Sequence, residues 1–170
     1  MSDLAIRPFR ETDWPAVAAI ITEVLSAGET YAVPVLDDAE ARDFWLGQPG
    51  AVAVAELDGT VVGTAKMGPN RPAQGSHIGT ASFMVSSAAR GAGVGRALGE
   101  HVVAWHREQG FAGIQFNAVV TTNTAAVALW RRLGFEVIGT VPGAFRRPDG
   151  SLAGLHVMFL DLARGRGVRA

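Results

Sequence analysis

Residues 90–97 read Arg-Gly-Ala-Gly-Val-Gly-Arg-Ala, and they lie between an apolar run at 81–85 and an amphipathic run at 97–109. The order of strand, glycine-rich loop and helix favours an anion cradle, because glycines permit backbone dihedrals and close approaches that other residues do not. Successive backbone N–H groups can then point into one concavity at the positive end of the following helix. The stretch therefore predicts a site for a phosphate or pyrophosphate.

The spacing of these glycines distinguishes between kinds of nucleotide loop. A Walker loop needs Lys-Ser or Lys-Thr after its last glycine, but Gly95 is followed by Arg96 and an alanine. A dinucleotide loop needs Gly-x-Gly-x-x-Gly, and the third glycine is missing whether the count starts at Gly91 or at Gly93. The pattern that remains is Arg90-x-x-Gly93-x-Gly95. For the loop alone, an ordinary strand-to-helix turn is an equal alternative.

Length and composition indicate one globular domain. The chain has 170 residues, of which 48% are hydrophobic and 18% charged, enough for a sizeable core. We expect a single domain over 1–162, followed by a glycine- and arginine-rich tail at 163–170 that is frayed. The first ten residues contain no signal-peptide hydrophobic region, and no apolar run reaches the roughly 20 residues of a spanning helix. The expected location is cytoplasmic.

Charge and cysteine content exclude several classes of partner and of chemistry. The formal net charge is -1, and no basic stripe or polybasic segment indicates a nucleic acid or a membrane surface as partner. There is no cysteine, which excludes disulfides, cysteine nucleophiles and thiolate metal sites. His101 and His106 are five positions apart, which is not the spacing of helical metal ligands, so no metal site is predicted.

Before the glycine loop, turn and capping residues mark the predicted elements. Thr12 is expected to cap a helix that Gly28 ends, and Asp37-x-x-Glu40 has the pattern of a capping box for a second, shorter helix. Asp58-Gly59 predicts a hairpin turn. Strands are predicted at 4–9, 51–57 and 60–67, and the sheet resumes at Ile78 after a loop at 68–76.

After the loop, a helix at 97–109 and a strand at 114–120 are predicted. Asn123 is expected to cap the next helix, which Gly134 ends. The buried face of that helix is predicted to be Ala126, Leu129, Trp130 and Leu133. Strands follow at 136–141 and 155–160, with a loop or hairpin tip at 143–154. The resulting order, β-α-α-β-β-β-α-β-α-β-β, predicts a mixed sheet flanked by helices.

Two motifs together make the chain similar to a known family. Arg90-x-x-Gly93-x-Gly95 resembles the acyl-CoA pyrophosphate loop of the GNAT (GCN5-related) N-acetyltransferases, and Leu133-Gly134-Phe135 at this distance resembles the family's second signature. The resemblance implies an α/β fold with a mixed, mostly antiparallel sheet of about seven strands flanked by about four helices. It also implies that strand 4 (81–85) and strand 5 (114–120) splay apart, and that acyl-CoA enters the gap.

The same resemblance implies acetyl-CoA as co-substrate, without a metal. Its pantetheine would pair with strand 4, and its pyrophosphate would lie on the amides of the loop. The residues implied to bind it are Met84, Val85, Arg90, Gly91, Gly93, Val94, Gly95, Arg96, Asn123, Ala126 and Trp130.

A narrower resemblance concerns the acceptor. Residues 66–70, 75–78, 116–117 and 122–123 are similar to a GNAT subgroup that includes fungal enzymes acetylating proline analogues such as azetidine-2-carboxylate. Glu29-Thr30 resembles the acceptor loop of phosphinothricin-type acetyltransferases. Both imply a small amino-acid-like amine as acceptor. The residues expected to bind or orient it are Asn117, Tyr31, Thr80 and Phe145.

The expected mechanism is direct attack of a neutral amine on the acetyl thioester, since there is no cysteine and no serine in a nucleophile-elbow context. A backbone N–H near Met84 or Val85 would polarise the thioester carbonyl. Candidates for the base are Glu29, His77 and, less favoured, His156, and each also has an ordinary structural explanation.

The sequence departs from the family pattern at two positions. Many members have a tyrosine, the acid for the leaving thiolate, where this chain has Trp130, and indole is too weak an acid to replace phenol. Thr80 stands where the subgroup often has asparagine.

Three alternatives remain open at this point: a non-catalytic acyl-CoA-binding module, a nucleotide-binding domain, and an acetyltransferase acting on a peptide N-terminus. The sequence carries no pattern for oligomeric state, although a homodimer is common in the resembled family.

Overall fold

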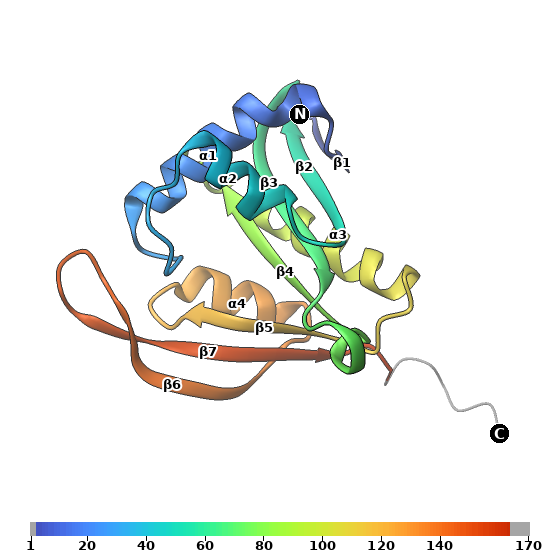
Figure 1. Cartoon of the computed structure of the whole chain (residues 1–170), viewed down its shortest axis with the longest axis vertical. Coiled ribbons are helices and arrows are strands. Elements are labelled where there is room, and N and C mark those ends of the chain that lie inside the picture. The colour runs from blue at the N-terminus through green and yellow to red at the C-terminus, as the bar shows by residue number, and fades with distance from the viewer. Residues whose placement is uncertain (1–2, 164–170) are drawn as a thin grey trace.

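The structure, a computed structural model, describes residues 3–163, so most of the predicted tail, 164–170, lies outside the described residues. The order of elements is the predicted one (Figure 1). The strands are β1 (Leu4–Pro8), β2 (Ala51–Leu57), β3 (Thr60–Pro69), β4 (Ile78–Val85), β5 (Gly113–Val120), β6 (Glu136–Arg146) and β7 (Leu152–Asp161). The helices are α1 (Trp14–Ala27), α2 (Asp38–Leu46), α3 (Val94–Glu108) and α4 (Thr124–Arg132).

All the strands form one seven-stranded sheet in the order β1-β2-β3-β4-β5-β7-β6. Every neighbouring pair is antiparallel except β4 and β5, which are parallel and pair only at Ile78 with Gly113 and at Gly79 with Ile114. Beyond Gly79 the two strands diverge, as Figure 1 shows. The predicted mixed sheet and its splay between strands 4 and 5 are therefore confirmed.

The helices cover both faces of this sheet. In Figure 1, α1 and α2 lie in front of β2 to β4, and α3 lies behind them. The front cluster buries Trp14, Val17, Ile20, Ile21, Leu25, Ala41, Trp45, Val54 and Met84. Behind, α3 packs on β2 and β3 through Val94, Leu98 and Val102. A further cluster joins Val103 of α3 to Trp130 of α4 and to β5 and β7.

Gly99 allows α3 and α4 to approach closely. A Cβ at this position would lie 2.7 Å from Leu133 Cδ1 and 3.0 Å from Trp130 Cζ3. The contact fixes α4 against α3, and it places the Trp130 ring beside the diverging strands.

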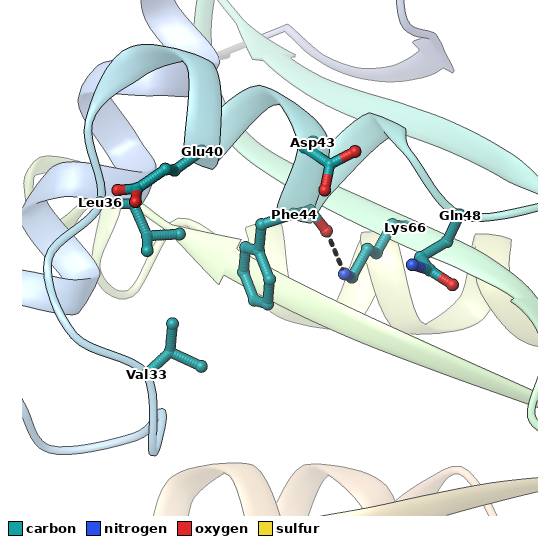
Figure 2. Close-up of a pocket in the computed structure, with 7 residues that line it drawn as sticks. All are labelled: Val33, Leu36, Glu40, Asp43, Phe44, Gln48 and Lys66. Atoms are coloured by element: carbon teal, nitrogen blue, oxygen red, sulfur yellow. Dashed lines mark hydrogen bonds between the residues drawn. The ribbon is translucent and has the colours of Figure 1, made fainter.

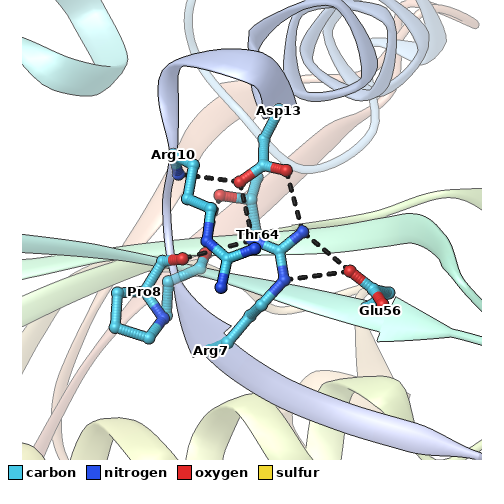
Figure 3. Close-up of polar contacts among 7 residues, drawn as sticks. Arg7, Pro8, Arg10, Asp13, Glu56 and Thr64 are labelled. Carbon is cyan, nitrogen blue, oxygen red and sulfur yellow. Dashed lines mark hydrogen bonds and ion pairs between the residues drawn. The ribbon is translucent and has the colours of Figure 1, made fainter.

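An ionic cluster fixes the start of α1 and corrects the predicted cap. Both Arg7 guanidinium NH2 groups donate to the Asp13 carboxylate at 2.8 Å, and Arg7 also binds Glu56 on β2 (Figure 3). Asp13, not Thr12, precedes the helix, and its Oδ2 accepts the Arg10 backbone N–H at 2.7 Å. The expectation for Thr12 was wrong because a short 3-10 turn, Glu11–Asp13, comes before α1.

Two further element boundaries differ from prediction. α3 begins at Val94 rather than at 97, since Gly93 adopts φ 78° and starts the helix directly. The predicted loop at 143–154 is mostly strand: β6 continues to Arg146 and β7 starts at Leu152. The hairpin tip is confined to 147–151, and Gly143 is absorbed in a register shift between Val141 and Phe145, where several β6 residues oppose one position of β7. On α4, Val127 is buried together with Trp130, and was not predicted to be.

Candidate functional site

The edge of β4 that faces the splay presents free backbone groups. On the opposite edge, the Ile78 carbonyl accepts from Asn70 and the Ser86 N–H donates to Val62, so even-numbered residues of β4 face β3. Because a strand residue points its N–H and C=O to the same side and the side alternates, Ala81, Phe83 and Val85 face the gap. Of the predicted pair, Val85 thus directs its N–H into the gap, while Met84 pairs towards β3.

The phenol of Tyr31 occupies the middle of this edge. It donates to the Phe83 carbonyl at 2.8 Å and accepts from the Phe83 N–H at 3.0 Å. Burial raises the pKa of Tyr31 to about 12 in spite of the hydrogen bond from Phe83. Tyr31 was predicted to bind the acceptor, and no sequence signal indicated this contact because the two residues are 52 positions apart.

The glycine loop has the open geometry that an anion cradle needs. Gly91 and Gly93 have φ values of 83° and 78°, and a Cβ at either would meet nothing within 4 Å. Ala97 makes the first intrahelical bond to Gly93, so the N–H groups of Val94, Gly95 and Arg96 precede the helical hydrogen-bonding pattern. These donors point along the positive end of α3.

Side chains around the loop hold it in place. Glu23 of α1 accepts from the Ser87 backbone N–H at 2.7 Å and from the Ser86 hydroxyl at 3.0 Å, and these bonds lower its pKa. This carboxylate was not predicted from the sequence. Arg90 is exposed, and Arg96 is paired with Glu100 at 2.7 Å on the surface of α3.

Aromatic rings close the wall of the gap next to α4. The Trp130 ring is 6% exposed and lies 4.6 Å from Phe83 and 4.9 Å from Phe116, measured between centroids. Asn123 caps α4 as predicted, accepting the Ala126 N–H at 3.3 Å. Trp130 is therefore a packing residue, and its ring forms part of the wall of the gap next to α4.

A pocket of about 240 Å³ lies on the same face of the sheet as α2. It brings together the predicted residues Thr80 and Asn117, and adds two cations, Lys66 and Arg71, with no carboxylate among the residues that line it. Its lining consists of Trp45, Gln48, Pro49, Ala51, Val52, Lys66, Met67, Gly68, Pro69, Asn70, Arg71, Thr80, Ala81, Ser82 and Asn117.

Asn117 is oriented by other amides. Its Nδ2 donates to Asn70 Oδ1 at 2.7 Å, and its Oδ1 accepts from Gln115 Nε2 at 2.8 Å. The register of β5 against β7 shifts between Phe116 and Val119, and this irregularity turns Asn117 to the exposed side, towards the loop after β3. The amide pair thus spans the gap between the two halves of the sheet.

Lys66 is half-buried between this pocket and a second, shallower one of about 440 Å³. Its ammonium donates to the Phe44 carbonyl and lies 4.1 Å from the Phe44 ring centroid (Figure 2). No carboxylate of residues 3–163 forms an ion pair with it, and burial lowers its pKa. The second pocket is lined by Val33, Leu36, Glu40, Asp43, Phe44, Gln48 and Lys66.

Tyr31 and four other residues predicted for catalysis or for the acceptor lie outside both pockets. Glu29 pairs with Arg147 Nε at 3.0 Å, and His77 is exposed just before β4. Phe145 is 4% exposed and packs with Val120 and Ala153. His156 Nδ1 lies 2.7 Å from the Thr140 hydroxyl. Catalytic or acceptor roles for these residues stay predictions.

Within 3–163, no group of three or more histidine and acidic side chains has the arrangement to hold a metal ion. No helix in the same range is long and apolar enough to cross a membrane.

Comparison with known proteins gives one family. The model of the acetyltransferase (GNAT) family matches residues 14–135. The L-methionine sulfoximine/L-methionine sulfone acetyltransferase of Pseudomonas aeruginosa is 33% identical over 150 residues, which cover 81% of this chain and 83% of that protein. The chain spans 66% and 13% of the lengths of two yeast relatives, N-acetyltransferase aca1 and Protein SPT10.

Several solved structures of acetyltransferases are also similar to this chain. A GCN5-related N-acetyltransferase from Kribbella flavida is 52% identical, with a TM-score of 0.90 over 94% of this chain and 98% of that chain. A ribosomal-protein-alanine N-acetyltransferase from Brucella melitensis is 34% identical, with a TM-score of 0.80 over 93% and 99%. A phosphinothricin acetyltransferase from Sinorhizobium meliloti, in complex with acetyl-CoA, is 25% identical, with a TM-score of 0.83 over 94% and 88%.

Proposed function

Because the chain belongs to the GNAT family of acetyl-CoA-dependent N-acetyltransferases, we propose that it transfers the acetyl group to the amine of a small amino-acid-like molecule. The observation that carries the acceptor class is the 240 Å³ pocket, which holds Lys66 and Arg71 without a carboxylate. A cationic pocket of this size suits a small acceptor that has a carboxylate beside its amine. It disfavours polyamines, whose charges Lys66 and Arg71 would repel.

The chain's residues fit acetyl-CoA at two places. The N–H groups at 94–96 and the open space at Gly91 and Gly93 suit the pyrophosphate. The backbone groups of Ala81 and Val85, on either side of the Phe83 groups that Tyr31 binds, suit an extended chain that pairs with the edge of β4, as an added strand would. When bound, acetyl-CoA supplies the activated acetyl thioester. The Val85 N–H, which faces the gap, is positioned to donate to an oxygen there, and one such donor can contribute about 3 kcal/mol.

We assign the acceptor to the pocket of about 240 Å³ described above. Lys66 and Arg71 bind the acceptor's carboxylate, and the amides of Asn117 and Asn70, with Thr80, orient its amine. No residue lining the pocket is a carboxylate or histidine. We therefore assign removal of the amine proton to water at the mouth of the pocket, with Glu29 and His77 as candidates for its final acceptor.

A second candidate function, acetylation of a peptide N-terminus, is favoured by the similarity to the Brucella enzyme named for ribosomal-protein alanine. A peptide has no free carboxylate next to its terminal amine, so its matching contact with Lys66 would be missing. The two functions therefore predict opposite acceptor preferences.

The experiment is a kinetic comparison of the wild type with Asn117→Ala. We expect the variant to raise the acceptor KM or lower kcat more than tenfold, a loss of about 1.4 kcal/mol or more, because the amine loses its orienting amide. Calorimetry should find acetyl-CoA affinity unchanged. Gln109→Ala, at an exposed amide at the end of α3 outside both pockets, is the matched amide control and should match the wild type. An equal loss of acetyl-CoA binding in Asn117→Ala would contradict the assignment.

A further inference from the structure

The leaving thiolate of an acyl transfer must gain a proton, and the residues that line the splay offer few donors. Positions 81–85 of β4 and 115–119 of β5 carry no titratable side chain. Trp130, on the α4 wall, offers an indole N–H, which is a hydrogen-bond donor and not an acid. A proton donor must therefore reach the gap from another element.

Tyr31 is that group. Its hydroxyl comes from the loop between α1 and α2 and binds both backbone groups of Phe83, at 2.8 and 3.0 Å. Phe83 is the central residue of the β4 edge that faces the gap, and its ring packs on Trp130 at 4.6 Å. The phenol thus lies at the gap, between Ala81 and Val85, the residues whose backbone groups remain for an acyl donor to pair with.

The loop that carries Tyr31 is fastened at both ends. Gly28 ends α1 with φ 65°, and the next residue, Glu29, is held by Arg147 at 3.0 Å. At the other end, Asp37 and Glu40 exchange capping hydrogen bonds with each other's backbone at 2.9 and 3.0 Å. A phenol on a loop anchored in this way can keep one position at the gap.

We propose that Tyr31 is the general acid of the reaction, and that its hydroxyl protonates the thiolate as the product forms. The inference rests on the proposed acetyl transfer. In the step, the new C–N bond forms and the C–S bond breaks, and the electron pair of the broken bond stays on sulfur. The Tyr31 O–H proton passes to sulfur, the proton lost by the amine leaves through water as described above, and the phenolate recovers a proton from bulk water. No oxidant or further reactant is needed.

The phenol enters the reaction in its protonated form. Because burial raises the pKa of Tyr31 to about 12, its hydroxyl is protonated throughout the neutral range. An acid is effective only while it is protonated, so activity should fall above its pKa.

The test uses the fact that Tyr31 is the only tyrosine of the chain. Growth on 3-fluorotyrosine labels position 31 alone and lowers the pKa of its phenol. We expect the alkaline limb of the kcat profile to move to lower pH, in step with the midpoint of the fluorine NMR titration. We also expect the fluorine resonance to shift when CoA alone binds. A limb that does not follow the titration, or a resonance that CoA leaves unmoved, overturns the proposal.

Tyr31→Phe keeps the ring and removes the hydroxyl. We expect kcat to fall at least tenfold and the alkaline limb to disappear, while the Kd for CoA by calorimetry changes less than threefold. Val35→Ala, on the same loop at a side chain that is 55% exposed, is the control and should match the wild type.

The outcomes separate the two proposals. If the wild type acetylates an amine and Tyr31→Phe does so equally fast, the acid assignment is overturned and the proposed function stands. If Tyr31→Phe instead binds CoA more tightly without losing kcat, the phenol only blocks the gap, and the assignment is overturned too. A wild type that binds CoA but acetylates no amine overturns both proposals.

Discussion

At the scale of single residues, Lys66 explains most about the acceptor. It is the only lysine of the chain, half-buried, and its charge is balanced by aromatic faces and a carbonyl instead of a carboxylate. Removing a cation from water is unfavourable unless it is paired. A half-buried ammonium without an ion pair at the wall of a pocket supports the proposal of an acceptor that carries a carboxylate.

Lys66→Met should raise the KM for an acceptor with a free carboxylate at least tenfold, because the ammonium that binds the carboxylate is lost. The KM for the matching carboxamide should be unchanged. Thermal unfolding should show no loss of stability, since methionine fills the space without a charge to desolvate. Arg107→Met, which removes an exposed charge on α3, is the control. Equal effects on the acid and its amide would contradict the role of Lys66.

The same residues show what the sequence could and could not predict. The caps at Asp37 and Asn123 and the turn at Asp58-Gly59 depend on neighbours a few positions away, and the structure has them. The bond between Asn117 and Asn70 joins residues 47 positions apart, and the contact of Tyr31 with Phe83 joins residues 52 apart. Only the fold brings such pairs together, so Asn70 and the phenol in the gap were not predicted.

At the scale of elements, the glycine loop and α3 are the part of the site whose residues lie closest together in the sequence. Gly91 and Gly93 both adopt left-handed backbone, and the helix begins immediately after Gly93. This geometry follows from short-range sequence, which explains why a glycine loop that opens a helix could be predicted, whereas its assignment to acyl-CoA needed the second motif at 133–135. The β6–β7 hairpin is the contrary case, since Gly143 indicated a turn that the pairing with β7 absorbs as a bulge.

Gly93→Ala should lower acetyl-CoA affinity at least tenfold in calorimetry, since a methyl group enters the space assigned to the pyrophosphate. Gly110→Ala is the matched control. Gly110 has φ 82° against 78° at Gly93, and a Cβ at either would meet nothing within 4 Å. Both variants carry the same backbone strain, of about 1–2 kcal/mol. The loop assignment fails if both leave acetyl-CoA binding at the wild-type level.

At the scale of the whole molecule, the two halves of the sheet are joined at the apex of the splay. Gly79, one of the few β4 residues that pair with β5, lies against the buried His106 of α3: a Cβ there would be 2.2 Å from His106 Cδ2. His106 Nδ1 lies 2.8 Å from the Val102 carbonyl, to which it donates as the neutral ring. Packing at this point determines where the strands begin to diverge, and therefore the position of both sites.

Burial lowers the pKa of His106 below its ordinary value of 6.5. The folded state therefore binds this proton less readily than the unfolded state. The contribution of the neutral His106 ring to the free energy of unfolding is fully present above about pH 6.5, and it is lost as the pH falls below that value. Urea unfolding between pH 5 and 7.5 should show this slope in the wild type, and His106→Gln should reduce it. His101→Gln, on the same helix, should keep it. If His106→Gln keeps the wild-type slope, the pH dependence of stability arises from other groups.

If the chain acetylates small amines that carry a carboxylate, it should distinguish an amino acid from its carboxamide, from a polyamine and from a peptide. The wild-type chain is supplied with acetyl-CoA and, in parallel, with L-methionine sulfone, its carboxamide, a polyamine and an alanine-terminated peptide. Thiol release is followed together with the mass of the product. We expect an acetylated amino acid as product, with kcat/KM at least tenfold above that of the carboxamide and the peptide. Faster turnover of the peptide or the polyamine would contradict it.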